Sequence, residues 1–373
     1  MTYYNASIFT PDGWVKGGFQ TGNGRFTAVL PGQNDGDVNL HGAKVIPGLV
    51  DIHTHGCAGE DFSDGSYDSL CKMAGAYARG GVTSFTPTSM TLPYSDLDAA
   101  FRAALAYRDS SPAGCSRIAG IHMEGPFLSE KKKGAQNAAY LRAPDFEAFR
   151  LLYEGCGELI RIVDMAPELP GAAEFSMKAS GLCTVSVAHT DADYETACAL
   201  FDAGISHVTH LFNAMPPIHH RKPGVIGAAS ERNGVTAELI CDGLHVHPSA
   251  VRMAFRLFPG RICLVSDSLR CCGMPDGEYE LGGQRVFLRG GVARLADGTI
   301  AGAAAGLFED MRNAVRFGIP EEDAIRAATF TPARVVGAAD SIGSIEAGKY
   351  ADFLVCGEDL SLQQVYIGGR AVT

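Results

Sequence analysis

The sequence predicts an α/β fold: a TIM-type (β/α)8 barrel with a small β-sandwich domain formed from both chain ends. Over the middle of the chain, eight short apolar runs alternate with helix-length stretches, which is typical of βα units around a parallel sheet. At the two ends, short apolar runs alternate instead with turn dipeptides, which is typical of short β-strands. The length of 373 residues also fits one large barrel-type domain or two domains better than one small core.

The two chain ends share one sequence pattern, in which short apolar runs alternate with turn signals. Within residues 1–46 the apolar runs are separated by turn signals at Asp12-Gly13, Gly22-Asn23-Gly24, Pro31-Gly32 and Asp35-Gly36. The tail, residues 344–373, returns to short strands with turns. We therefore predict that residues 1–46 and 344–373 build one small β domain, and that residues 47–343 form the barrel domain.

Eight apolar runs are the predicted barrel strands: Leu49–His53, Val82–Pro87, Ile118–Glu124, Ile160–Met165, Thr184–His189, Ser206–His210, Ala237–Asp242 and Ile262–Asp267. Helices are predicted over Asp96–Arg108, Asp145–Glu154, Tyr194–Ala203, Leu307–Phe317 and Glu321–Val336. Eight strand–helix units over roughly 250 residues are the usual size of a TIM-type barrel, whose active site lies at the C-terminal ends of the strands.

Charge and composition argue against several classes of partner. The chain has 31 Lys and Arg against 42 Asp and Glu, a net charge of −11, and no basic block, so neither a nucleic acid nor an anionic membrane is expected as a partner. No apolar run is long enough for a transmembrane helix, and the N-terminus does not read as a signal peptide. The 11 scattered Cys without a C-x-x-C pair indicate reduced thiols and a cytoplasmic location.

Histidines and carboxylates mark the predicted strand ends. His53 and His55 follow an apolar run, and because residues i and i+2 of a strand share a face, both imidazoles could reach one metal ion. Glu124, His189, His210 and Asp267 each end a predicted strand. At about 31 residues per βα unit, the spacings place these groups on strands 1, 3, 5, 6 and 8, where they converge on one mouth of the barrel.

Such a set predicts a hydrolytic metal site. Imidazole and carboxylate ligands with open coordination positions suit Zn²⁺, Fe²⁺ or a similar ion. Taken singly, each residue has a simpler interpretation: a solvated loop pair for His53 and His55, a helix cap for Glu124, and a core or rim position for the others.

Several segments resemble the amidohydrolase superfamily and, within it, the N-acetylglucosamine-6-phosphate deacetylase family. They are Pro47-Gly48-Leu49-Val50-Asp51-Ile52-His53-Thr54-His55-Gly56, His122-Met123-Glu124-Gly125-Pro126-Phe127, Thr209-His210-Leu211-Phe212-Asn213-Ala214-Met215, Asp242-Gly243-Leu244-His245-Val246, Gly298-Thr299-Ile300-Ala301-Gly302 and Glu346-Ala347-Gly348-Lys349-Tyr350-Ala351-Asp352. They occur in the family's order from about Val45 to the C-terminus. The resemblance implies a deacetylase that converts N-acetylglucosamine 6-phosphate to glucosamine 6-phosphate and acetate.

The resemblance also implies the role of each site residue. Glu124, His189 and His210 match the main metal ligands, His53 and His55 match a second-metal pair that only some members keep, and Asp267 matches the catalytic acid and base. One or two divalent ions, Zn or Fe, are therefore expected. The substrate-contacting positions are Ala135, Gln136, Asn213, Ala214, Arg221, His245 and Ala303. Of these, Arg221 matches the phosphate ligand, which in the family reaches across a homodimer interface.

Arg221 suits a phosphate independently of the resemblance, because a guanidinium donates two parallel hydrogen bonds. Its simpler interpretation is a surface residue on a loop. The sequence departs from the family around the substrate: Gln136 stands where a His is common, Lys222 replaces a frequent Glu, and Ala303-Ala304-Ala305 follows Ala301-Gly302 near the acetyl pocket.

Three alternatives stay open. The substrate could be another N-acyl amino sugar, such as N-acetylgalactosamine 6-phosphate, or a cyclic amide. Cyclic amidases usually bridge two metals with a carboxylated Lys on the fourth strand, and Ile160–Met165 contains no Lys. An inactive binding or scaffold barrel is the third alternative, and it is disfavoured because every metal and acid–base position is filled.

Overall fold

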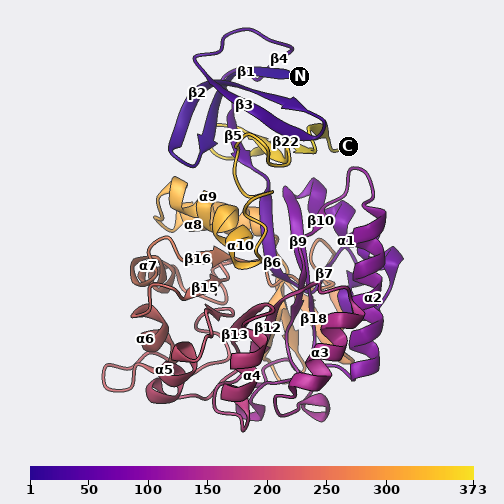
Figure 1. Ribbon diagram of the computed structural model, residues 1–373, viewed down its shortest axis with the longest axis vertical. Helices are drawn as coiled ribbons and strands as arrows, with labels where there is room; N and C mark the ends of the chain where they lie inside the picture. The colour runs from indigo at the N-terminus through magenta and orange to yellow at the C-terminus, as the bar shows by residue number, and fades with distance from the viewer.

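The computed structural model describes residues 1–373 and contains a helix-wrapped barrel below a small β domain (Figure 1). Eight parallel strands form the barrel in the order of the sequence: β6 (Leu49–Thr54), β9 (Val82–Ser89), β11 (Ile121–Met123), β12 (Ile160–Met165), β13 (Thr184–Val187), β14 (His207–Val208), β15 (Thr236–Leu239) and β16 (Ile262–Leu264). The short β10 (Arg117–Ile118) extends the edge of β9. The backbone N–H of Asp267 donates to the carbonyl of His53 at 2.9 Å and joins the last strand segment to the first. The predicted barrel is confirmed.

One helix follows each barrel strand. These helices are α1 (Tyr67–Arg79), α2 (Tyr94–Ser110), α3 (Phe146–Gly155), α4 (Ala172–Ala179), α5 (Tyr194–Asp202), α6 (Gly224–Ser230), α7 (Pro248–Leu257) and α8 (Leu307–Arg316). Their buried faces pack on the strands in one large apolar core. None of the helices combines the length and the apolarity that crossing a bilayer requires.

The last predicted helix, Glu321–Val336, is in fact two helices. α9 (Glu321–Ala328) ends before Thr329, whose backbone has φ −134° and ψ −80°, and α10 (Phe330–Val335) then begins. Pro332 explains the break, because its ring clashes with the carbonyl four residues earlier in a continuous helix. Ala333 of α10 packs with Val50 and Ile240 at the N-terminal end of the barrel and closes that end.

The two chain ends meet in one eight-stranded sheet. Its strands are β1 (Thr2–Thr10), β2 (Gly13–Gly22), β3 (Arg25–Pro31), β4 (Val38–Asn39) and β5 (Lys44–Pro47) with β21 (Phe353–Cys356), β22 (Leu362–Ile367) and β23 (Arg370–Ala371). β5 pairs with both β1 and β21, so the N- and C-terminal strands share hydrogen bonds. Tyr3, Phe19 and Phe353 pack as an aromatic core of their own. The domain boundaries at 46/47 and 343/344 stay a prediction.

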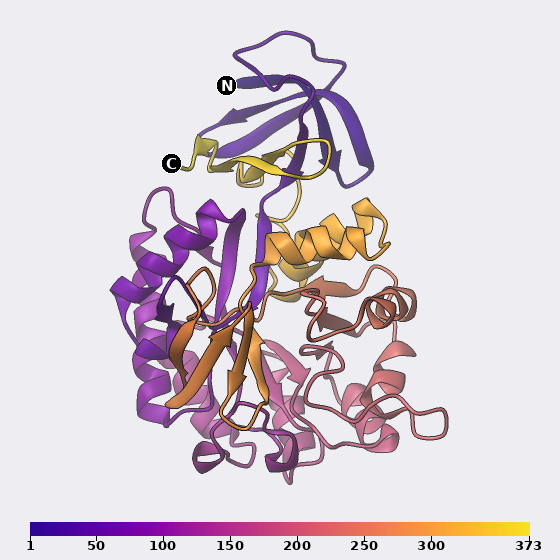
Figure 2. The same ribbon diagram turned by 180° about the vertical axis from the view of Figure 1, so that it is seen from behind.

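An antiparallel sheet that the sequence reading did not predict follows β16. Its strands are β17 (Gly277–Leu281), β18 (Gln284–Arg289), β19 (Val292–Leu295) and β20 (Ile300–Ala303), and Figure 2 shows them in orange in front of the barrel. The signal was present in the sequence, because Gly282-Gly283, Gly290-Gly291 and Asp297-Gly298 are hairpin turns that separate alternating runs. The barrel is thus interrupted between its last strand and α8.

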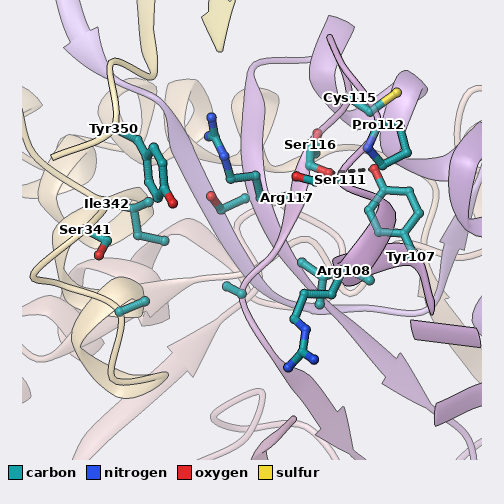
Figure 3. A pocket seen from close by; sticks show the side chains of 14 residues that line it. Tyr107, Arg108, Ser111, Pro112, Cys115, Ser116, Arg117, Ser341, Ile342 and Tyr350 are labelled. Atoms are coloured by element: carbon teal, nitrogen blue, oxygen red, sulfur yellow. Dashed lines mark hydrogen bonds between the residues drawn. The ribbon is translucent and has the colours of Figure 1, made fainter. Parts of the chain in front are cut away.

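The joint between the barrel and the β domain contains a cavity of about 290 Å³ (Figure 3). Arg117 stacks on the ring of Tyr350 with its guanidinium 4.3 Å from the ring centre, and Arg25 lies at the same distance. Arg117 also pairs with Asp352, a carboxylate of the β domain that is nearly buried. The charged groups here bind one another, so the arrangement fastens the two parts together.

Gly48 offers a test of this joint, because it lies between β5 and β6 and its N–H donates to the backbone carbonyl of Asp352 at 2.9 Å. A Cβ at this position would lie 2.5 Å from Cγ2 of Thr83. We expect Gly48→Ala to lower the free energy of unfolding by about 1–3 kcal/mol, measured as a fall in the melting temperature of several degrees. The control is Gly234→Ala, because Gly234 has nothing within 4 Å of an added Cβ. Equal melting temperatures would contradict the prediction.

Candidate active site

A cavity of about 320 Å³ lies at the C-terminal ends of the barrel strands, the end at which TIM barrels carry their active sites. Ten of the residues singled out from the sequence lie in its wall: His55, Glu124, Ala135, Gln136, His189, His210, Asn213, Ala214, His245 and Asp267. His53 is fully buried directly behind them. The predicted convergence of these groups on one barrel mouth is therefore what the fold produces.

Glu124, His189 and His210 form the first candidate metal-binding group. Oε1 of Glu124 lies 3.1 Å from Nε2 of His189 and 3.1 Å from Nε2 of His210. The two imidazole nitrogens are themselves 3.1 Å apart. All three side chains are buried, and their ligand atoms are close enough together to hold one ion.

His53, His55 and Glu124 form a second group that shares the carboxylate. Nε2 of His55 lies 3.3 Å from Oε2 of Glu124, and Nε2 of His53 lies 3.7 Å from Oε1. Asp267 reaches the same place from β16, with its Oδ1 3.3 Å from His55 and 3.5 Å from His53. Glu124 therefore lies between two imidazole pairs and belongs to both groups that could hold an ion.

The hydrogen bonds of the rings show that these groups fit a cation. Nδ1 of His53 donates to Glu238 at 2.8 Å, that of His55 to the carbonyl of Thr88 at 3.1 Å, and that of His189 to the carbonyl of Lys132 at 2.8 Å. A neutral ring that carries its proton on Nδ1 has a lone pair on Nε2. The Nε2 atoms and two carboxylates thus face one small space and need positive charge between them, either as ring protons or as a metal ion. Although burial works to lower it, the pKa of His210 is raised to about 9 by Glu124, which shows how strongly the site favours positive charge.

The carboxylates are ionised in this environment. Burial works to raise the pKa of Glu124, but His53, His189 and His210 outweigh it and hold that pKa well below its usual range. Burial also opposes ionisation of Asp267, yet His53 and His55 lower its pKa below the ordinary value. Asp267 can therefore accept a proton at neutral pH.

The strands end earlier than the sequence predicted. The predicted ends were His189, His210 and Asp267, but β13, β14 and β16 stop two or three residues before them. The reason is that these three residues adopt positive φ angles of 43°, 31° and 49°, which takes the chain out of the β conformation. Left-handed backbone at non-glycine residues is strained and is concentrated at functional sites.

A layer of buried polar side chains beneath the site was missed from the sequence. Oε2 of Glu238 on β15 accepts from Nδ1 of His53 and, at 3.1 Å, from the backbone N–H of His210. Its Oε1 lies 3.3 Å from Nε2 of His207. Glu238 thus connects the two metal-binding groups from below. The sequence signal was a carboxylate within the apolar run Ala237–Asp242.

His122, two residues before Glu124, makes its hydrogen bonds to other groups. Its Nδ1 donates to the carbonyl of Ile52 and its Nε2 to Asp164, both at 2.9 Å. Burial works against a charged ring, but Asp164 and Glu238 raise the pKa of His122 to about 9. His122 is therefore an imidazolium that links β6, β11 and β12 inside the barrel.

The substrate side of the cavity is built from loops. Nδ1 of His245 is bonded to Asp242 at 2.7 Å, which leaves Nε2 as its remaining polar atom. The amide of Asn213 donates back to the carbonyls of His210 and Leu211, and Ala214 has a positive φ of 51°. Gln136 is buried and bonded to Glu124.

Two predicted substrate contacts lie outside the cavity wall. Ala303 pairs with the segment after β16, where its N–H donates to the carbonyl of Asp267 at 2.9 Å, and its neighbours Ala301 and Gly302 line the cavity instead. Arg221 is exposed on the loop before α6. That loop projects from the barrel in Figure 1.

Comparison with known proteins agrees with this geometry. The Amidohydrolase family model matches residues 44–372. The N-acetylglucosamine-6-phosphate deacetylase of Vibrio furnissii is 35% identical over 94% of this chain and 89% of its own length. The N-acetylgalactosamine-6-phosphate deacetylase of Escherichia coli O157:H7 is 33% identical over 97% of both chains.

A solved structure is similar over the whole length. It is the D267A mutant of the N-acetyl-D-glucosamine-6-phosphate deacetylase from Mycobacterium smegmatis in complex with N-acetyl-D-glucosamine-6-phosphate. Its TM-score is 0.94 at 33% identity, and the match covers 100% of this chain and 99% of that one.

Replacing Glu238 tests the layer below the site. We expect Glu238→Gln to weaken zinc binding by about 10- to 100-fold, because the loss of a partner that orients a ligating His has effects of this size. The measurement is a zinc titration of chelator-treated protein. Glu231→Gln, at an exposed acid, is the matched control. Unchanged zinc affinity in Glu238→Gln would contradict the role given to this carboxylate.

Proposed function

The chain belongs to the amidohydrolase family, and we propose that it hydrolyses the acetamide of N-acetylglucosamine 6-phosphate to glucosamine 6-phosphate and acetate. The observation that carries this proposal is the convergence of Glu124, His189 and His210 with Asp267 at one cavity. Relatives that are named for this reaction cover nearly the whole chain.

We propose one or two divalent ions, zinc or iron, as the cofactor. His189, His210 and Glu124 would hold the first ion, and His53 and His55 would share Glu124 with a second. Three nitrogen or oxygen ligands with a free coordination position are typical of catalytic zinc, and imidazole also suits iron. Such an ion, when bound, lowers the pKa of water and polarises a carbonyl.

Asp267 moves the proton in the proposed reaction. It accepts a proton from water as the water oxygen bonds to the amide carbon. It then gives that proton to the amide nitrogen as the C–N bond breaks, so that one carboxylate acts first as base and then as acid. Its lowered pKa keeps the carboxylate ionised, so that it is free to accept a proton in the first step. We propose that His245, whose ring is held by Asp242, contacts the substrate in this cavity.

The remote phosphate orients the amide for attack. We propose that Arg221 of a second copy binds it in a homodimer, together with Asn213 and Ala214. Exposure of Arg221, and its position outside the cavity of its own chain, support this arrangement. We also propose a cytoplasmic location, which the 11 unpaired cysteines support.

N-acetylgalactosamine 6-phosphate is the second candidate substrate, because a relative named for it is about as similar as the glucosamine relatives. Acetate release should be compared across phosphorylated and unphosphorylated N-acetylglucosamine and N-acetylgalactosamine with zinc or iron added. The proposal expects the highest kcat/KM for N-acetylglucosamine 6-phosphate. No acetate from any of the four sugars with either metal would overturn it.

Asp267→Asn tests the acid–base assignment. The variant should retain its metal but lose about 10²- to 10⁴-fold in turnover, because general acid–base catalysis has effects of this size. Metal content by atomic emission and initial rates of acetate release give the two readings. Full activity in a metal-loaded variant would remove Asp267 from this role.

Arg221→Ala tests the phosphate contact. KM for the phosphorylated sugar should rise by about tenfold or more, while kcat/KM for the unphosphorylated sugar should stay unchanged, because only the phosphate contact is lost. Lys16→Ala, at an exposed cation on β2 of the small β domain, is the control. A similar loss for both sugars would show that Arg221 acts on folding or assembly instead.

A further inference from the structure

We propose that Gln136 is a positioning residue that fixes the bridging carboxylate Glu124 and thereby makes its two oxygens unequal as ligands for divalent cations. Gln136 lies on the loop between the 3-10 turns η2 (Glu130–Lys132) and η3 (Ala138–Tyr140) and is 2% exposed. The inference rests on the proposed metal-dependent function and concerns how the centre holds two ions.

The orientation of the Gln136 amide follows from its partners. Its Oε1 accepts from the backbone N–H of Thr91 at 2.7 Å. A backbone N–H can only donate, so the amide oxygen must face Thr91 and the NH₂ group must face Glu124. Nε2 then donates to Oε2 of Glu124 at 2.6 Å.

Thr91 is itself a fixed anchor. An added Cβ at Gly125, next to Glu124, would lie 3.2 Å from Cβ of Thr91, so the loops after β9 and β11 pack tightly against each other. Gln136 therefore connects Glu124 to a rigid point outside the cavity. Bonds at both ends of a buried amide hold that amide in one rotamer.

The hydrogen bond from Gln136 makes the two oxygens of Glu124 chemically different, because it reaches only Oε2. Oε1 receives no amide hydrogen bond and lies 3.1 Å from the imidazoles of His189 and His210, with that of His53 farther away at 3.7 Å. Oε2, which faces His55 at 3.3 Å, already shares a lone pair with Gln136. A carboxylate oxygen that accepts a strong hydrogen bond has less electron density to offer a cation. We therefore expect a tight ion at His189 and His210 and a weaker one at His53 and His55.

The same bonds leave Gln136 little capacity to bind a sugar. Its second NH₂ proton faces Sδ of Met90 at 3.8 Å, and its oxygen is bonded to Thr91. A histidine at this position could still accept from Thr91 with one nitrogen and donate to Glu124 with the other. A side chain of similar length without polar atoms, such as Met, could do neither.

The test is a zinc titration of chelator-treated full-length protein by equilibrium dialysis. The wild type should bind two ions with unequal dissociation constants. In Gln136→Met the second constant should fall by about 10- to 100-fold, because Oε2 regains the lone pair that it shares with Gln136, while the first constant, which depends on Oε1, should change less, so that their ratio narrows. Gln136→His should restore the wild-type ratio. Gln284→Met, which removes another amide bond to this loop at Ala135, is the matched control and should leave both constants unchanged.

Kinetics of the same variants with the sugar substrates at saturating zinc distinguish this positioning role from a direct contact between Gln136 and the sugar. Unchanged zinc constants with a raised KM in Gln136→Met would make Gln136 a sugar contact and overturn the proposal. Equal weakening of both ions, or a single ion per wild-type chain, would also overturn it. Because the titration contains no sugar, it stands apart from the proposed reaction: inactivity of the wild type on every sugar would overturn the reaction and leave the zinc result intact.

Discussion

The structure depends on the electrostatic crowding around Glu124. The barrel brings imidazole nitrogens and two carboxylates into one buried space, and their repulsion is relieved by positive charge, either as protons on the rings or as a bound cation. Three of the four rings are held by separate elements at their far nitrogen, His53 by β15, His55 by β9 and His189 by the η2 turn, whereas Nδ1 of His210 has no partner. The fold thus holds these groups close together although they destabilise one another, and a bound cation would stabilise the site. The strained backbone of the residues at the strand ends is a second local cost of forming this site.

The segment after β16 connects the reacting carboxylate to the rest of the cavity. The carbonyl of Ser268 accepts from the N–H groups of His55 and Gly56, and the carbonyl of Asp267 accepts from Ala303. One short stretch therefore positions the proposed acid and base, a second-group ligand and the strand β20. The inserted sheet is consequently part of the active site, because a shift of β20 would move the backbone of Asp267 through the hydrogen bond from Ala303.

The parts of this site that follow from the regular alternation of strands and helices could be predicted from the sequence. His53, Glu124, His189, His210 and Asp267 could be placed because parallel strands of a barrel end at one rim. The inserted sheet had readable turn dipeptides, but its position over the mouth depended on pairing between Ala303 and Asp267, distant in the chain. Glu238 and the bonding of Gln136 could not be predicted, because which buried polar group finds which partner is decided by tertiary packing. The break at Thr329 was readable from Pro332.

The net charge of −11 is compatible with a small anionic substrate, because charges spread over the surface have little effect on an anion bound inside a cavity. At physiological ionic strength, charges separated by more than about 8 Å are largely screened, so the acidic surface is weakly felt inside the cavity. Lys131 and Lys132 lie in the cavity wall, and Asp191 pairs with both at its rim. The total charge therefore argues against a polyanion that would cover a wide surface, but it does not exclude one phosphate group that enters a single cavity with two lysines in its wall.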